Sequence, residues 1–177
     1  MVLIFTVFCL SPLYGADRAP INVNLIIDSS SSLTSVKANM TAWISGHLDQ
    51  VLANGDRVTI WSVGTATRVI YTGTINSQPD RDAAKKSIQD ISGTGDTADF
   101  SGALREASVQ ASQGQQAFCY TLLISASPSA LTALLSGPQS NLMRFSRMEE
   151  FSGWRAVVVG LNMDVRVRRA AAAFFGS

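Results

Sequence analysis

The chain has 177 residues, of which 46% are hydrophobic, so it is long enough to bury the core of one ordinary domain. Its 14 basic and 13 acidic residues leave a formal net charge of +1, which gives no electrostatic argument for binding nucleic acid or an anionic membrane. The sequence contains no internal repeat and no low-complexity tract, so we expect a single domain.

The first 16 residues differ in composition from the rest. An uninterrupted apolar stretch at residues 2–10 is followed by Ser11-Pro12 and by the small residues Gly15-Ala16. This order is typical of a signal peptide, and the apolar stretch is too short to span a bilayer comfortably. We therefore predict a signal peptide at residues 1–16 and a folded domain at residues 21–176. The protein would be exported to the periplasm or the extracellular space, and would touch a membrane only through an uncleaved leader.

Strand and helix patterns alternate through the remaining sequence. Hydrophobic and β-branched runs predict strands at residues 23–28, 57–63, 68–75, 118–124 and 155–161. Apolar residues at helical spacing predict helices at residues 36–52, 79–91, 100–111, 131–135, 142–151 and 165–175. This order predicts a doubly wound α/β fold, with a mainly parallel sheet and helices on both of its faces. A hairpin turn at residues 64–67 would add one antiparallel edge strand.

The first predicted strand ends in a carboxylate followed by hydroxyls at alternate positions. The sequence there is Asp28-x-Ser30-x-Ser32. Ligands gather at the carboxyl ends of strands in open α/β sheets, and these three side chains offer only hard oxygen donors, which Mg²⁺, Ca²⁺ and Mn²⁺ prefer. The alternative is a serine-rich turn in which Ser32 or a neighbour caps the next helix.

The spacing of these residues resembles the first loop of the metal-ion-dependent adhesion site of von Willebrand factor A (VWA) domains. Three later stretches also resemble that family, in the same order along the chain. Residues 54–58 resemble the start of its second strand, residues 93–104 the second metal-site loop and following helix, and residues 155–160 a late strand ending in glycine. The resemblance covers residues 21–176 and implies a three-layer, Rossmann-like sandwich.

The same resemblance implies which residues would hold a metal ion. Ser30, Ser32 and a threonine of the second loop would bind it directly, and Asp28 would act directly or through water. Thr97 is the nearest threonine to the family's position, although it lies one residue out of register, and Thr94 is a more distant candidate. The implied ion is Mg²⁺, or alternatively Mn²⁺ or Ca²⁺.

The third loop departs from the family pattern. Ala126, within Ser125-Ala126-Ser127, stands where the family has an aspartate. The loss of one negative charge should weaken the affinity for a divalent cation, because ligand charge tunes such sites.

These features predict a non-enzymatic, adhesion-type binding module. The resemblance further implies that its partner would be a protein whose acidic residue completes the metal shell. The alternative is a structural or assembly subunit of an envelope complex with a degenerate, metal-free site.

An enzyme is not expected, because there is no Gly-x-Ser-x-Gly elbow or Walker-type Gly-Lys-Ser/Thr. The sole histidine, His47, would lie about 20 Å along a helix from Ser32. Cys119 lies in an apolar run and is expected to be a small buried hydrophobe.

Overall fold

The computed structural model describes residues 18–113, 118–137, 140–141 and 153–161, together with residues 163, 165, 167 and 169. The predicted signal peptide at 1–16 and the predicted helix at 142–151 lie outside these ranges, as does most of the predicted helix at 165–175. Within the described part of the chain, no helix is long and apolar enough to cross a membrane.

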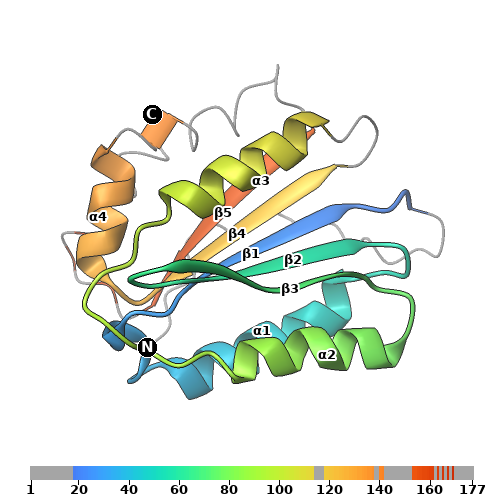
Figure 1. The fold of residues 1–177 in the computed structure, drawn as a ribbon, viewed down its shortest axis with the longest axis horizontal. Helices are drawn as coiled ribbons and strands as arrows, with labels where there is room; N and C mark the ends of the chain where they lie inside the picture. The colour runs from blue at the N-terminus through green and yellow to red at the C-terminus, as the bar shows by residue number, and fades with distance from the viewer. Residues whose placement is uncertain are drawn as a thin grey trace.

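Five strands form one sheet in the order β3-β2-β1-β4-β5 (Figure 1). The strands are β1 (Asn22–Asp28), β2 (Arg57–Val63), β3 (Thr67–Thr74), β4 (Cys119–Ser125) and β5 (Trp154–Gly160). β1 is parallel to β2 and β4, and β4 is parallel to β5, whereas β3 runs antiparallel to β2 at one edge. The predicted mainly parallel sheet with one antiparallel edge strand is confirmed.

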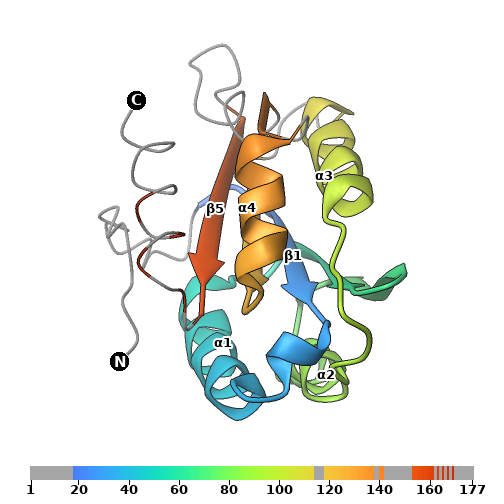
Figure 2. The same ribbon diagram turned by 90° about the vertical axis from the view of Figure 1, so that its left-hand side faces the viewer.

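Helices cover both faces of the sheet (Figures 1 and 2). They are α1 (Lys37–Val51), α2 (Gln78–Gln89), α3 (Ser101–Gln113) and α4 (Pro128–Ser136), with a short 3-10 turn, η1 (Ser31–Leu33), before α1. Side chains of α1 and α2 belong to one hydrophobic core, and those of α3 and α4 to a second core on the opposite face. This three-layer arrangement confirms the predicted doubly wound fold.

The central position of β1 explains its continuous apolar run. Successive side chains of a strand point to opposite faces, so Ile26 enters the core beneath α3 and α4, while Leu25 and Ile27 enter the core beneath α1 and α2. On α1, the four-residue spacing places Met40 and Ile44 against the latter core. The alternating side chains of β1 and the four-residue repeat of α1 therefore pack together in one buried core.

One helix boundary differs from the sequence prediction by more than two residues. α4 begins at Pro128, three residues before the predicted start. The hydroxyl of Ser127 accepts a hydrogen bond from the Ala130 amide at 3.3 Å, and proline follows at the first helical position, where its missing N–H has no consequence. The apolar pattern predicted residues 131–135 and missed the first turn, which depends on the cap at Ser127.

Cys119 and His47 have the structural positions that the sequence predicts. Cys119 is fully buried, and burial raises the pKa of its thiol to about 11. The Asn24 side-chain amide donates to its sulfur at 3.1 Å. His47 is exposed on α1, with Nδ1 2.8 Å from the carbonyl oxygen of Trp43.

Candidate functional site

Three loops meet where the parallel strands end (Figure 2). They are residues 28–34 after β1, residues 92–97 between α2 and α3, and residues 125–127 after β4; we call this surface the carboxyl edge. Two backbone hydrogen bonds of 2.8 Å join the first two loops, from the Thr94 amide to the Ser29 carbonyl and from the Ser31 amide to the Gly95 carbonyl. The predicted site loops are therefore assembled together.

A glycine permits the close contact between the first two loops. A Cβ atom at Gly93 would lie 2.8 Å from the Ser30 carbonyl oxygen and 2.9 Å from the Thr34 hydroxyl. Such distances are too short for a side chain. Gly93 therefore allows the second loop to lie directly against the first.

Asp28 lies at the centre of the carboxyl edge and is 0% exposed. Its Oδ1 accepts from the Ser30 amide at 2.8 Å, and its Oδ2 accepts from the Ser125 hydroxyl at 2.6 Å and the Ala126 amide at 3.3 Å. All three donors are neutral, and none of the ion pairs within the described ranges includes Asp28. The carboxylate is hydrogen-bonded, but no cationic side chain among the described residues pairs with it.

Ser30 has a buried hydroxyl without a hydrogen-bond partner among the residues that the structure describes. A buried hydroxyl left in this way costs about 1–3 kcal/mol, so native proteins rarely retain one without a reason. The Ser30 hydroxyl belongs to the same turn whose amide binds Asp28, and its oxygen is an available hard donor.

The serines of this loop do not cap the first long helix. α1 has Val36 at its N-cap position, with no side-chain cap bond, and Ser30 at the N-cap of η1 also makes none. Ser32 lies within η1 and is partly exposed. The capping alternative for these hydroxyls is therefore wrong.

The second loop supplies less than the sequence suggested. Thr97 is exposed, and no hydrogen bond within the described ranges links it to Asp28, Ser30 or Ser32. The carboxylate of Asp99 accepts from the Ser101 hydroxyl and, at 2.9 Å, from the Ser101 amide at the start of α3. These bonds lower the pKa of Asp99.

Sequence reasoning missed the role of Ser125. Its hydroxyl donates to Asp28 and accepts from the Ser127 amide at 3.0 Å, so it fixes the third loop against the first. The signal was present in the pattern of strands. β1 and β4 are parallel neighbours with Ile27 opposite Ile124, which places the next residues, Asp28 and Ser125, side by side.

The donor set fits a hard divalent cation in type but provides little charge. Hydroxyl oxygens of Ser30 and Ser32 lie on the same loop as the carboxylate of Asp28. Ala126 adds no carboxylate, and the described ranges hold no group of three or more His, Cys, Asp or Glu residues suited to a metal ion. Such a set favours Mg²⁺ or Mn²⁺ over softer metals and predicts weak binding.

Comparison with known proteins identifies similarity at the level of structure. No family model and no curated protein matches the sequence. A manganese-loaded TRAP protein from Plasmodium vivax is similar, with a TM-score of 0.66 and 14% identity over 89% of this chain and 63% of that one. A von Willebrand factor type A protein from Catenulispora acidiphila gives a TM-score of 0.57 and 14% identity over 88% of this chain and 41% of that one. Proximal thread matrix protein 1 from the mussel byssus gives a TM-score of 0.59 and 15% identity over 82% of this chain and 38% of that one.

The chain spans less than two thirds of each of these structures. Sequence identities of 14–15% relate the proteins through their fold alone. The sheet order, the two helical layers and these structural matches agree, and the chain has the fold of a VWA domain.

Proposed function

We propose that the chain is a non-enzymatic, adhesion-type module that binds a protein partner at its carboxyl edge with the help of a divalent cation. The observation that carries this proposal is the buried, unpartnered hydroxyl of Ser30 beside the uncompensated carboxylate of Asp28. One cation would satisfy both groups at once. The similar structures include a manganese-loaded protein and a matrix protein, which supports this class of function.

In this proposal, Ser30, Ser32 and Thr97 bind Mg²⁺ through their hydroxyl oxygens. Asp28 does not bind the ion directly but accepts a hydrogen bond from a water molecule on it. The reason is that its Oδ2 already accepts from the Ser125 hydroxyl and the Ala126 amide. An aspartate or glutamate of the partner completes the shell. That carboxylate would supply the negative charge that Ala126 lacks, so the ion and the partner should each strengthen the binding of the other.

A second candidate function is a structural or assembly subunit of an envelope complex that uses no ion. It is favoured by the hydrogen bonds of Asp28, whose two oxygens already accept from three donors of the protein. Recognition would then use protein surfaces alone, and partner binding would not respond to chelators.

Calorimetric titration of Mg²⁺ and Mn²⁺ into chelator-stripped protein separates the two. We expect saturable binding that Ser30→Ala abolishes and that Ser35→Ala, a change to an exposed hydroxyl in the same segment, leaves intact. Ala126→Asp should raise the affinity about tenfold or more, because it restores a carboxylate beside Asp28. If neither the native protein nor Ala126→Asp binds ion up to about 10 mM, the metal-free function is favoured.

We also propose that residues 1–16 direct export and are removed before the domain at 21–176 acts. Mass spectrometry of protein recovered from the medium or periplasm would give the mature N-terminus. Recovery of the intact chain from the cytoplasm alone would contradict export.

A further inference from the structure

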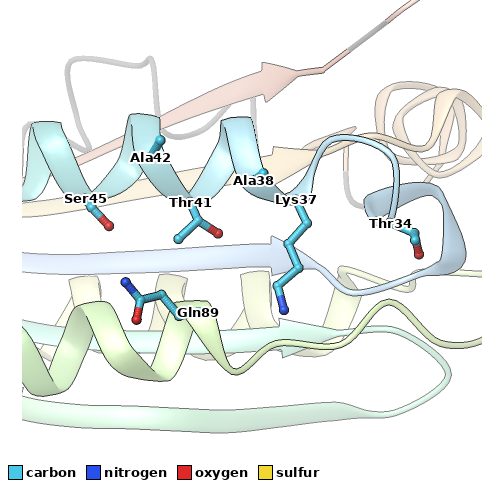
Figure 3. A pocket seen from close by; sticks show the side chains of 7 residues that line it. All are labelled: Thr34, Lys37, Ala38, Thr41, Ala42, Ser45 and Gln89. Carbon is cyan, nitrogen blue, oxygen red and sulfur yellow. The ribbon is translucent and has the colours of Figure 1, made fainter.

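A groove of about 680 Å³ lies between α1 and α2, on the helical layer next to the carboxyl edge. Figure 3 shows Lys37 extending from α1 and Gln89 rising from α2 into the gap between the two helices. Thr41 and Ser45 follow Lys37 at four-residue intervals and line the same groove. The residues that line it include no aspartate or glutamate.

Lys37 differs from the other lysines of the chain. Lys85 pairs with Asp49, and Lys86 pairs with Asp90. Lys37 is half-buried and has no hydrogen bond or ion pair to any residue in the described part of the chain. An ammonium that extends into a groove without a counter-charge favours the approach of an anion.

Two hydroxyl groups beside Lys37 are also without partners. Thr41 Oγ1 and Ser45 Oγ are buried, and neither has a hydrogen-bond partner among the described residues. Helical hydroxyls ordinarily bond to the carbonyl one turn earlier, as Thr132 and Ser136 do in α4 at 2.8 and 2.7 Å. The α1 hydroxyls therefore keep their hydrogen-bonding capacity.

The residues that line the groove thus carry a cation, a side-chain amide and two buried hydroxyls, and none of them is acidic. Its size exceeds what a single small ion needs, and it continues from the first loop, because Thr34 lines it and also lies against Gly93 of the second loop. We infer that this groove binds an acidic peptide segment of a protein partner. A carboxylate of the peptide would bind Lys37, and other oxygen atoms of the peptide would accept hydrogen bonds from Thr41, Ser45 and Gln89. The site is separate from the proposed cation site and needs no ion.

The test uses the full chain in EDTA at low ionic strength and a fluorescein-labelled octaglutamate peptide, with an octaglutamine peptide as the neutral comparison. Anisotropy should show binding of octaglutamate alone. Lys37→Gln should weaken it about three- to tenfold, the range for loss of one charge contact at a partly buried site. Lys86→Gln removes the same charge from α2 outside the groove and should change the affinity less than twofold. Equal weakening by both variants, or equal binding of octaglutamine, would overturn the inference.

The hydroxyls provide a second test that separates binding from folding. Thr41→Val removes a buried, unpartnered hydroxyl while keeping the side-chain shape, so the free protein should be equally or more stable to heat. The same variant should bind octaglutamate more weakly. Amide chemical shifts in the native protein should move at residues 37–45 and at Gln89 on peptide addition. Shifts confined to another surface would contradict the assignment.

Discussion

Two buried aspartates at opposite ends of the parallel strands β1 and β2 have very different surroundings. Asp56 precedes β2 and, like Asp28, is 0% exposed. It forms an ion pair with Arg18, whose Nη1 donates to Oδ1 at 2.9 Å. The amides of Ile21 and Ala53 donate to the same carboxylate at 3.0 and 2.8 Å. Within the described ranges, the donors to Asp28 are all neutral.

This difference distinguishes a closed structural site from an open one. At Asp56, the cation and the amide donors balance the charge and tie together the segment before β1, the end of α1 and the start of β2. At Asp28, the hydrogen bonds fix the carboxylate in place, but among the described residues no cation pairs with it and the nearby hydroxyl of Ser30 has no partner. A ligand can relieve this deficit at the carboxyl edge, whereas none is needed at Asp56.

The largest expected effect is the loss of the Asp56 charge. Asp56→Asn should lower the free energy of unfolding by about 3–5 kcal/mol, because it leaves Arg18 partly buried without its partner. Asp28→Asn should change it by less than about 1 kcal/mol in EDTA, since the lost hydrogen bonds are offset by removal of an uncompensated charge. Urea unfolding of both variants tests the comparison, and equal losses would break it.

The bond between Ser125 and Asp28 should rank second. Ser125→Ala should lower the free energy of unfolding by about 1–2 kcal/mol, because Asp28 Oδ2 loses a donor and the Ser127 amide loses its acceptor. Ser112→Ala, at an exposed hydroxyl on α3, should change stability by less than about 0.5 kcal/mol. If Ser125→Ala is as mild as this control, Ser125 does not hold the third loop.

Ser30 should separate stability from ion binding. In EDTA, Ser30→Ala should unfold at the same temperature as the native protein or a higher one, since it removes an unpartnered buried hydroxyl. With Mg²⁺ present, only the native protein should gain thermal stability. A marked loss of stability in EDTA would show that Ser30 is already satisfied in the free protein.

The smallest effect concerns Asp99, between the second loop and α3. Bonds from Ser101 lower its pKa in the folded protein below the ordinary value of 3.8. Asp99 therefore contributes stability above about pH 4, and loses that contribution as the pH falls through its lowered folded pKa. The stability difference between the native protein and Asp99→Asn should shrink between about pH 6 and about pH 3 in chemical unfolding. A difference independent of pH would contradict this assignment.

Local patterns in the sequence were sufficient to predict most of the fold. The apolar run of β1, the four-residue spacing of α1 and the hairpin of β2 and β3 all follow from side-chain periodicity, which depends only on neighbouring residues. The Asp28-x-Ser30-x-Ser32 spacing likewise marked one loop of the site. α4 was placed too late because its start depends on the cap at Ser127 rather than on apolar residues.

Only the tertiary structure decided what surrounds each polar group. The donor from Ser125 to Asp28 comes from 97 residues away, and Arg18 reaches Asp56 across 38 residues. The unpartnered state of Ser30 and Lys37 also depends on which segments approach them and which do not. Periodicity specifies which face of an element is buried, but charge compensation depends on contacts between distant segments, and these are set by packing in three dimensions.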